Sequence, residues 1–363
     1  MRRARWLAPW KDSVEKPALY HCLSRVVDRR FVFGEVEREK FRMFMRMQEN
    51  FSGCRVLSYC VMSNHFHLLL EVPPMPVGGI SDEDLLKRLS AIYTEAVVAE
   101  VAKELTKARR MVADGLANES LVERIHERYT YRMHNLSEFM KALLIRFTRW
   151  FNRTHERSGT LWEERFKSVI VESGVAARTI AAYIDLNPVR AGMVADPAEY
   201  RWSSYGEAVG GGTKGNGKKA RAGLVRACMS HHGAGFEAEK WRDVSRIYRQ
   251  VLGMALGRKS GRAEVGPVRG VTKNTAEMLE SKDNETVLPD IRFAAMLRCR
   301  VRYFTDGAVI GSKVFVNEAF ALSRERFTAG RKDGARRLRG NGKPAAGVVW
   351  SMRDLRVRIS DGG

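Results

Sequence analysis

The sequence has few cysteines, no long hydrophobic run and no internal repeat. Its five cysteines are odd in number and form no CxxC pair, so reduced, buried cysteines are expected rather than a disulfide framework. No apolar stretch is long enough to cross a bilayer. The basic segment 1–10 also lacks the apolar core of a secretory signal. These absences predict a cytoplasmic protein without a membrane partner.

Positive charge is what the sequence has in excess. The chain carries 63 Lys and Arg against 42 Asp and Glu, a formal net charge of +21. A compact chain with this excess repels itself, and a polyanion usually neutralises the repulsion. Nucleic acid is the commonest polyanion, and an anionic membrane surface is the alternative. Charge alone therefore predicts nucleic-acid binding, and any prediction of catalytic chemistry depends on the sequence motifs.

Hydrophobic periodicity predicts strands interrupted by helices. Strands are expected over 20–25, 55–62, 65–72 and 165–172, and helices over 35–50, 81–132, 137–155 and 175–186. Ser63 and Asn64 favour a tight turn between the middle two strands. This order predicts an α+β protein with an antiparallel sheet and helices on one face of it.

Composition divides the chain into four parts. The first domain is expected over 1–209, with a helical insertion at about 74–135. Residues 210–223, GGGTKGNGKKARAG, predict a flexible basic linker because they contain almost nothing to bury. A mostly helical region without a recognisable motif is expected over 224–330. A basic tail follows over 331–363.

His65 and His67 are the most informative residues. They lie two apart on an expected strand, so both side chains project from the same face of the sheet. Two imidazoles on one face can converge on a single metal ion. A bare HxH pair is also compatible with two ordinary, hydrogen-bonded histidines, and the motif alone leaves both interpretations open.

A second pair, Tyr183 and Asn187, occurs in AAYIDLNPVRAGMV. The spacing of four places both side chains on one helix face if the helix extends that far. A tyrosine beside a metal ion is a competent nucleophile toward a phosphodiester, and Asn187 offers an oxygen as third metal ligand. Tyr183 as a core residue and Asn187 as a helix cap before Pro188 are the structural alternatives.

Candidate DNA contacts follow from LWEERFKS. Arg165 and Lys167 are expected on one strand face near Trp162 and Phe166, a combination of cations and aromatic faces that suits single-stranded DNA. The alternative places Phe166 in the core and the cations on a solvated face. Arg190, just after the tyrosine helix, is a candidate for gripping the scissile phosphate.

These motifs together carry a family resemblance. The succession YHCLSR, YCVMSNHFHLLLE, FMKALLIRFTRWFNRTHERSGTLWEERFKSVIVE, YIDLNPVRAGMV and WSSY resembles the REP-associated tyrosine transposases, which are bacterial single-tyrosine HUH transposases. The resemblance covers 20–205 apart from 73–134. It implies a ferredoxin-like or RRM-like core, His65, His67 and Asn187 as metal ligands, and Tyr183 as nucleophile. The implied product is a 5′-phosphotyrosine link with a free 3′-hydroxyl.

The resemblance also implies a cofactor and a partner. The ligand set suits Mg²⁺ or Mn²⁺, and the ligating histidines must be neutral, so activity is expected to fall below about pH 6.5. The partner would be single-stranded or hairpin DNA, bound by a nucleoid-associated monomer or homodimer. A catalytically silent repeat-binding regulator and a replication-initiator or relaxase-type HUH nuclease are the alternative functions.

Overall fold

The computed structural model describes residues 6–212, 214–229, 238–255, 297, 302–337 and 349–353. The strands are β1 (Ala18–Arg25), β2 (Arg55–Val61), β3 (His65–Val72), β4 (Lys167–Val171), β5 (Gly307–Gly311), β6 (Arg336–Arg337) and β7 (Trp350–Arg353). The helices of the first 190 residues are α1 (Glu35–Ser52), α2 (Asp82–Leu89), α3 (Glu95–Ala113), α4 (Ser120–Thr130), α5 (Leu136–Thr154), α6 (Val175–Asp185) and α7 (Asn187–Arg190). They are followed by α8 (Ser204–Gly210), α9 (Gly215–Cys228), α10 (Trp241–Ala255), α13 (Arg302–Asp306) and α14 (Lys313–Ala321).

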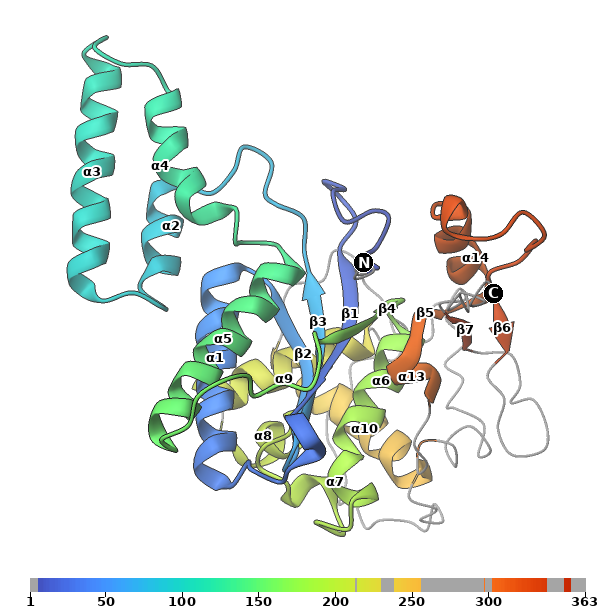
Figure 1. Ribbon diagram of the computed structural model, residues 1–363. Helices are drawn as coiled ribbons and strands as arrows, with labels where there is room; N and C mark the ends of the chain where they lie inside the picture. The colour runs from blue at the N-terminus through green and yellow to red at the C-terminus, as the bar shows by residue number, and fades with distance from the viewer. Residues whose placement is uncertain are drawn as a thin grey trace, which may run out of the picture.

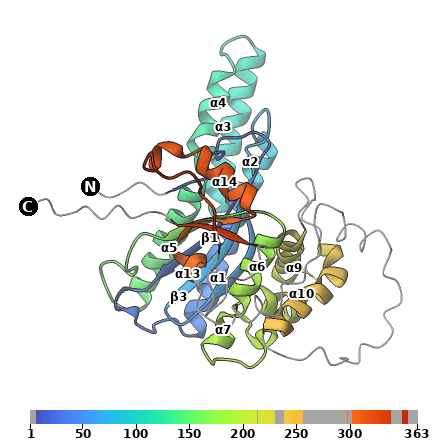
Figure 2. The ribbon, with the colours of Figure 1, turned by 90° about the vertical axis from the view of Figure 1, so that its right-hand side faces the viewer.

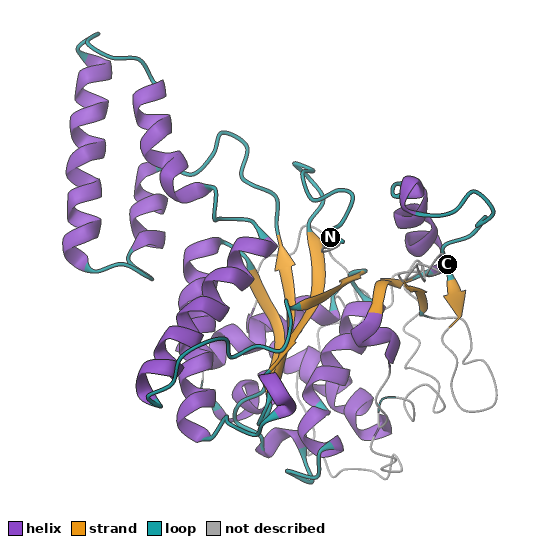
Figure 3. Ribbon diagram, viewed as in Figure 1, coloured by secondary structure: helices purple, strands orange, loops and turns teal. Residues whose placement is uncertain are grey.

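The core of the fold is one sheet, whose strands are orange in Figure 3. Its first four strands along the sequence are antiparallel neighbours in the order β2-β3-β1-β4. Helix α1 connects β1 to β2, and α5 precedes β4. This chain order and strand order are those of a ferredoxin-like fold. The predicted α+β class with a ferredoxin-like antiparallel sheet is therefore confirmed.

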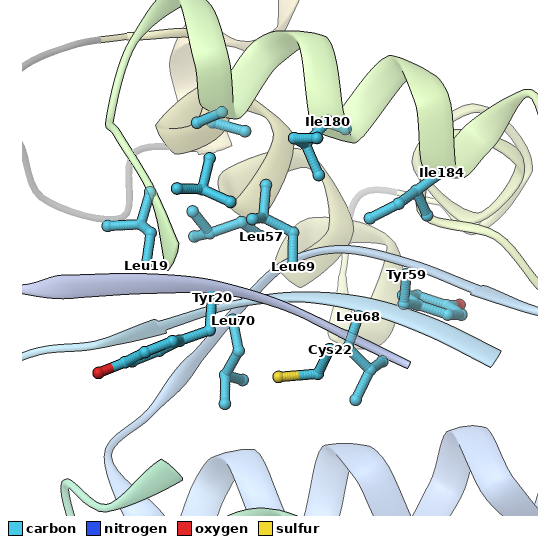
Figure 4. Packing of buried hydrophobic residues seen from close by; sticks show 14 of the residues in the cluster. Leu19, Tyr20, Cys22, Leu57, Tyr59, Leu68, Leu69, Leu70, Ile180 and Ile184 are labelled. Carbon is cyan, nitrogen blue, oxygen red and sulfur yellow. The ribbon is translucent and has the colours of Figure 1, made fainter. Parts of the chain in front are cut away.

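Helices cover both faces of this sheet, whereas the sequence predicted helices on one face. Helices α1 and α5 lie on one face, and α6 and α9 pack against the other (Figure 1). Leu19 and Leu69 point toward Ile180 of α6, while Tyr20 and Leu70 point away from it (Figure 4). The reason is that β1 and β3 carry apolar residues on both faces and are buried along nearly their whole length.

The C-terminal region extends the same sheet. Strand β5 pairs in parallel with β4, β7 pairs antiparallel with β5, and β6 pairs with β7. The region predicted to be mostly helical thus contributes a strand, and the expected tail contributes two more. These strands cover the edge that β4 would otherwise leave open. The breaker-rich stretch 257–289, Cys299 and Arg339 lie outside the described residues.

The predicted flexible linker is a buried helix in the structure. Residues 215–223 form most of α9, in which Ala220, Leu224 and Val225 are buried. Gly223 lies so close to β2 that a Cβ at this position would be 2.5 Å from the carbonyl oxygen of Val56. The glycine content here permits close packing of helix on strand rather than flexibility.

The helical insertion consists of α2, α3 and α4, which project from the connection between β3 and α5 (Figure 1, Figure 2). A separate apolar cluster holds them together, with Leu85, Leu89, Val101, Leu105 and Ile125 buried in it. Neither these helices nor any other within the described residues combines the length and the apolar character needed to cross a membrane.

Candidate active site

The histidine pair lies on β3, on the face covered by α6. The rings of His65 and His67 are 5.2 Å apart between centroids, and His67 is buried while His65 is half-buried. The turn that precedes them is closed by a hydrogen bond from the Met62 amide to the His65 carbonyl. The alternation expected of a strand thus brings both imidazoles to one face.

Tyr183 is brought to this pair by α6. Its ring lies edge-on to the His67 ring, with 6.1 Å between centroids. Only 2% of the residue is exposed, because Phe304 of α13 packs against it at 5.0 Å between ring centroids. The structure therefore places a phenol beside the histidines and covers it with the C-terminal region.

Asn187 lies where α6 ends and α7 begins. Its Nδ2 donates to the carbonyl oxygens of Tyr183 and Ile184, at 3.3 Å and 3.0 Å. The amide nitrogen thus satisfies carbonyls at the end of α6, as a capping residue would. Its Oδ1 accepts no hydrogen bond from the described residues, so this oxygen is available as a ligand.

Hydrogen bonding sets the orientation of the His65 ring. Its Nδ1 lies 2.7 Å from Oδ1 of Asn64, and the Nδ2 of Asn64 donates to the Arg29 carbonyl at 2.7 Å. The bond to Arg29 fixes which end of the Asn64 amide faces His65. Nδ1 of His65 therefore carries a proton, and in the neutral ring Nε2 has the lone pair.

The residues present fit a divalent metal ion with three protein ligands. Among the described residues, no group of three or more His, Cys, Asp or Glu side chains could hold a metal ion. A metal at this position therefore needs an oxygen from another residue type in addition to the two imidazoles. Asn187, four residues after Tyr183 at the end of α6, is the residue predicted to supply it.

His21 on β1 belongs to this cluster and was missed in the sequence. Its Nε2 lies 3.0 Å from Nδ1 of His67, and its Nδ1 lies 2.7 Å from the carbonyl oxygen of Phe304. Burial lowers the pKa of His21 from 6.5 to about 4 and lowers the pKa of His67 as well. The alternation of YHCLSR could have placed His21 on the site face beside Leu19 and Leu23.

Arg190 contacts the tyrosine rather than extending into solvent. Its guanidinium carbon lies 4.0 Å from the centroid of the Tyr183 ring. Its two terminal nitrogens donate to the carbonyl oxygens of Tyr183, at 2.8 Å, and of Leu297, at 2.7 Å. Arg190 thus fixes the Tyr183 ring from one side, and its contact with a phosphate remains a prediction.

Lys167 and Arg165 are both exposed, but only Lys167 belongs to β4. Lys167 pairs with Leu23, which in turn pairs with His67, so the lysine lies in the same row of the sheet as the buried histidine. Arg165 lies in the bend before the strand. The predicted strand 165–172 therefore begins two residues late, and Arg165 is not held in its register.

The aromatic residues near these cations pack against the core, which favours the alternative interpretation for Phe166 over a stacking platform for bases. Phe166 is buried, and the Trp162 ring packs against Phe66 with 5.5 Å between centroids. The indole nitrogen of Trp162 donates to the Thr148 hydroxyl at 2.9 Å. These side chains pack on the α1 and α5 side of the sheet because that face has its own apolar core.

Arg25 is a further cation that the sequence did not single out. It ends β1 and pairs directly with His65 across the sheet. It is half-buried, and its positive charge contributes to lowering the pKa of His67. Strand register is the signal that would have found it, since the residue opposite a ligand lies beside the site.

Part of the chain is similar to known proteins. Residues 16–109 match the family described as "Transposase IS200 like", a stretch that contains both histidines and ends before Tyr183 and Asn187. No curated protein matches the chain. A solved structure described as "Structure of the REP associates tyrosine transposase bound to a REP hairpin" shares 12% identity, covers 60% of this chain and 88% of its own, and has a TM-score of 0.35. Residues 16–109 are thus similar to the IS200-like transposases, which confirms for this part of the chain the resemblance predicted from its motifs.

Proposed function

We propose that the protein is a metal-dependent single-strand DNA endonuclease and strand transferase that acts at hairpin-forming repeats. The observation that carries this proposal is the position of Tyr183, whose ring lies 6.1 Å from that of His67 although 116 positions separate them in the chain. Nucleophile and ligands come from one chain, which supports an active monomer. Chromosomal repeats as substrate would place the protein in the cytoplasm with the nucleoid.

The chemistry is a transesterification at one backbone phosphate. The phenol oxygen of Tyr183 attacks phosphorus, the bond from phosphorus to the 3′ oxygen breaks, and the phenolic proton is released toward that leaving oxygen. The segment on the 3′ side of the cut then stays on the tyrosine through its 5′ phosphate, and the segment on the 5′ side of the cut ends in a 3′-hydroxyl. Attack by a 3′-hydroxyl reverses the step and joins strands.

His65, His67 and Asn187 would hold a divalent metal, Mg²⁺ or Mn²⁺, through two imidazole nitrogens and one amide oxygen. When bound, such an ion polarises the phosphate and stabilises the charge that develops on it. The histidines must be neutral to act as ligands. Burial favours the neutral form of His67 by lowering its pKa, so this ligand stays unprotonated below the ordinary histidine range.

Cations around the site would hold the strand. Lys167 and Arg25 lie in the sheet rows of His67 and His65, and Arg165 is exposed just before β4. We infer that these side chains neutralise backbone phosphates, while Arg190 steadies the tyrosine ring and reaches the scissile phosphate once DNA is bound. Because Phe304 covers Tyr183, the C-terminal region must move aside before a phosphate can reach the phenol.

A covalent adduct tests the proposal. The protein is incubated with Mn²⁺ and a labelled hairpin oligonucleotide with single-stranded flanks, and the products are separated on a denaturing gel. A protein–DNA adduct should form and should disappear in Tyr183→Phe. Tyr131→Phe, at an exposed tyrosine of the insertion, is the matched control and should leave the adduct unchanged. An adduct of equal yield in Tyr183→Phe would refute Tyr183 as nucleophile.

A binding protein without catalysis is the second candidate function, and the burial of Tyr183 favours it. A phenol that is 2% exposed cannot attack DNA until it is uncovered. This candidate predicts tight hairpin binding and no adduct at any Mn²⁺ concentration. The same gel, combined with a binding titration, separates the two functions.

A further inference from the structure

His21 connects the C-terminal region to a metal-ligating histidine through its two ring nitrogens. Nδ1 lies 2.7 Å from the Phe304 carbonyl oxygen, and Nε2 lies 3.0 Å from Nδ1 of His67. The rings of His21 and His67 are stacked, with 5.1 Å between centroids and 22° between planes. His21 is fully buried, so water cannot substitute for either partner.

The Phe304 carbonyl determines which ring nitrogen donates and which accepts in the two hydrogen bonds that link Phe304, His21 and His67. A carbonyl oxygen only accepts, so Nδ1 of His21 must carry a proton and donate it to Phe304. In the neutral ring Nε2 of His21 then has a lone pair, and it accepts from Nδ1–H of His67. His67 is thereby held as the tautomer that is protonated at Nδ1, with the lone pair on Nε2.

We propose that His21 is a positioning residue that fixes this tautomer and turns Nε2 of His67 toward the metal site. The metal part of this inference rests on the proposed function. Asn64 makes the equivalent contact with Nδ1 of His65, so both ligands present the same nitrogen. Ligating histidines are usually held by a hydrogen bond at the second ring nitrogen, and removing that partner weakens metal binding roughly 10- to 100-fold.

The inference also gives the C-terminal region a place in the site. The carbonyl of Phe304 accepts from His21, and the Phe304 ring packs on Tyr183. The orientation of one metal ligand therefore depends on a residue 283 positions away from His21 in the sequence. Residues 302–306 thus influence the orientation of His67 through the backbone carbonyl of Phe304 rather than through a side chain.

The full-length protein and two variants test the inference. His21→Phe keeps an aromatic ring but removes both hydrogen bonds. His21→Gln keeps an oxygen that can accept from His67 and an N–H₂ group that can donate. His126→Gln is the control, because His126 pairs with Asp82 in the insertion, away from the site. Thermal melting of each variant shows whether the fold is retained.

Two readouts report on the tautomer and on metal binding. Long-range ¹⁵N spectra of histidine-labelled, metal-free protein identify the protonated nitrogen of His67, and a Mn²⁺ titration followed by electron paramagnetic resonance gives the affinity. We expect Nδ1 protonation in the wild type, loss of that preference in His21→Phe, and a Mn²⁺ affinity lowered about 10- to 100-fold in this variant. His21→Gln should restore the tautomer and most of the affinity.

The outcomes separate the two proposals. An unchanged His67 tautomer and unchanged Mn²⁺ affinity in folded His21→Phe would overturn the positioning role. A wild-type protein that binds no Mn²⁺ would instead overturn the proposed metal site, while the ¹⁵N spectra still decide whether His21 fixes the tautomer. Equal losses in His21→Gln and His21→Phe would also overturn the role, because the retained acceptor should compensate.

Discussion

Asp185 anchors the helix that carries Tyr183, and its burial makes the stability of the protein depend on pH. The carboxylate is fully buried and accepts hydrogen bonds from the Tyr205 amide at 3.0 Å and the Tyr248 hydroxyl at 2.6 Å. Burial nevertheless dominates and raises the pKa of Asp185 from 3.8 to about 7. The folded state therefore prefers the protonated form more strongly than the unfolded state does.

The direction and the magnitude of the change in the free energy of unfolding with pH follow from this difference in the pKa of Asp185. A pKa that is raised on folding contributes stability below the unfolded value, and this contribution is lost as pH rises through about 7. At about 1.4 kcal/mol per unit, the loss between pH 5 and pH 8 is about 2.5 kcal/mol. Asp185→Asn stays neutral throughout, so its free energy of unfolding should lack this decline.

Urea unfolding at pH 5 and pH 8 measures the effect. The quantity to compare is the difference between wild type and Asp185→Asn, because the lowered pKa of His21 acts in the opposite direction. The neutral His21 contributes stability above the unfolded pKa of 6.5, and this is lost as pH falls toward about 4, which costs about 2 kcal/mol at pH 5. If Asp185→Asn shows the same change from pH 5 to pH 8 as the wild type, a buried ionising carboxylate is refuted.

Three further predictions follow from the geometry. Gly223→Ala should lower the free energy of unfolding by about 1–3 kcal/mol because its Cβ would meet the Val56 carbonyl. A flexible linker would tolerate the change, so an unchanged melting temperature would contradict the packing. Lys167→Ala should reduce the slope of log affinity for hairpin DNA against log salt by about 1, and an unchanged slope would exclude a phosphate contact. Phe304→Ala should uncover Tyr183 and raise the rate of adduct formation several-fold; an unchanged rate would show that the cover does not limit access.

The strands, the common face of His65 and His67 and the spacing of Tyr183 and Asn187 could be predicted because each depends on a local pattern. Alternation places two histidines on one face of β3, and helical spacing places Tyr183 and Asn187 about one turn apart. The ligand and nucleophile assignments remain predictions. The spatial approach of helix to strand came from the family resemblance, since no local pattern encodes it.

The glycine-rich segment shows where composition misleads. Gly and Lys in GGGTKGNGKKARAG are typical of a linker, yet α9 packs against β2 there. Glycine is compatible with two opposite situations, a chain with nothing to bury and a helix packed too closely for a Cβ. Only the neighbouring backbone distinguishes them, and that backbone belongs to Val56, more than 160 residues earlier. The packing of Trp162 against Phe66 could not be predicted for a similar reason, because its partner lies on another element.

The C-terminal region is the clearest case of contact with the candidate site without a sequence signal. It contacts three site residues: the Phe304 carbonyl accepts from His21, the Leu297 carbonyl accepts from Arg190, and the Phe304 ring packs on Tyr183. Two of these contacts use backbone oxygens, which every residue possesses. Contacts of this kind depend on the path of the chain rather than on residue identity. The absence of a motif over 224–330 therefore does not exclude contacts between this region and the site residues.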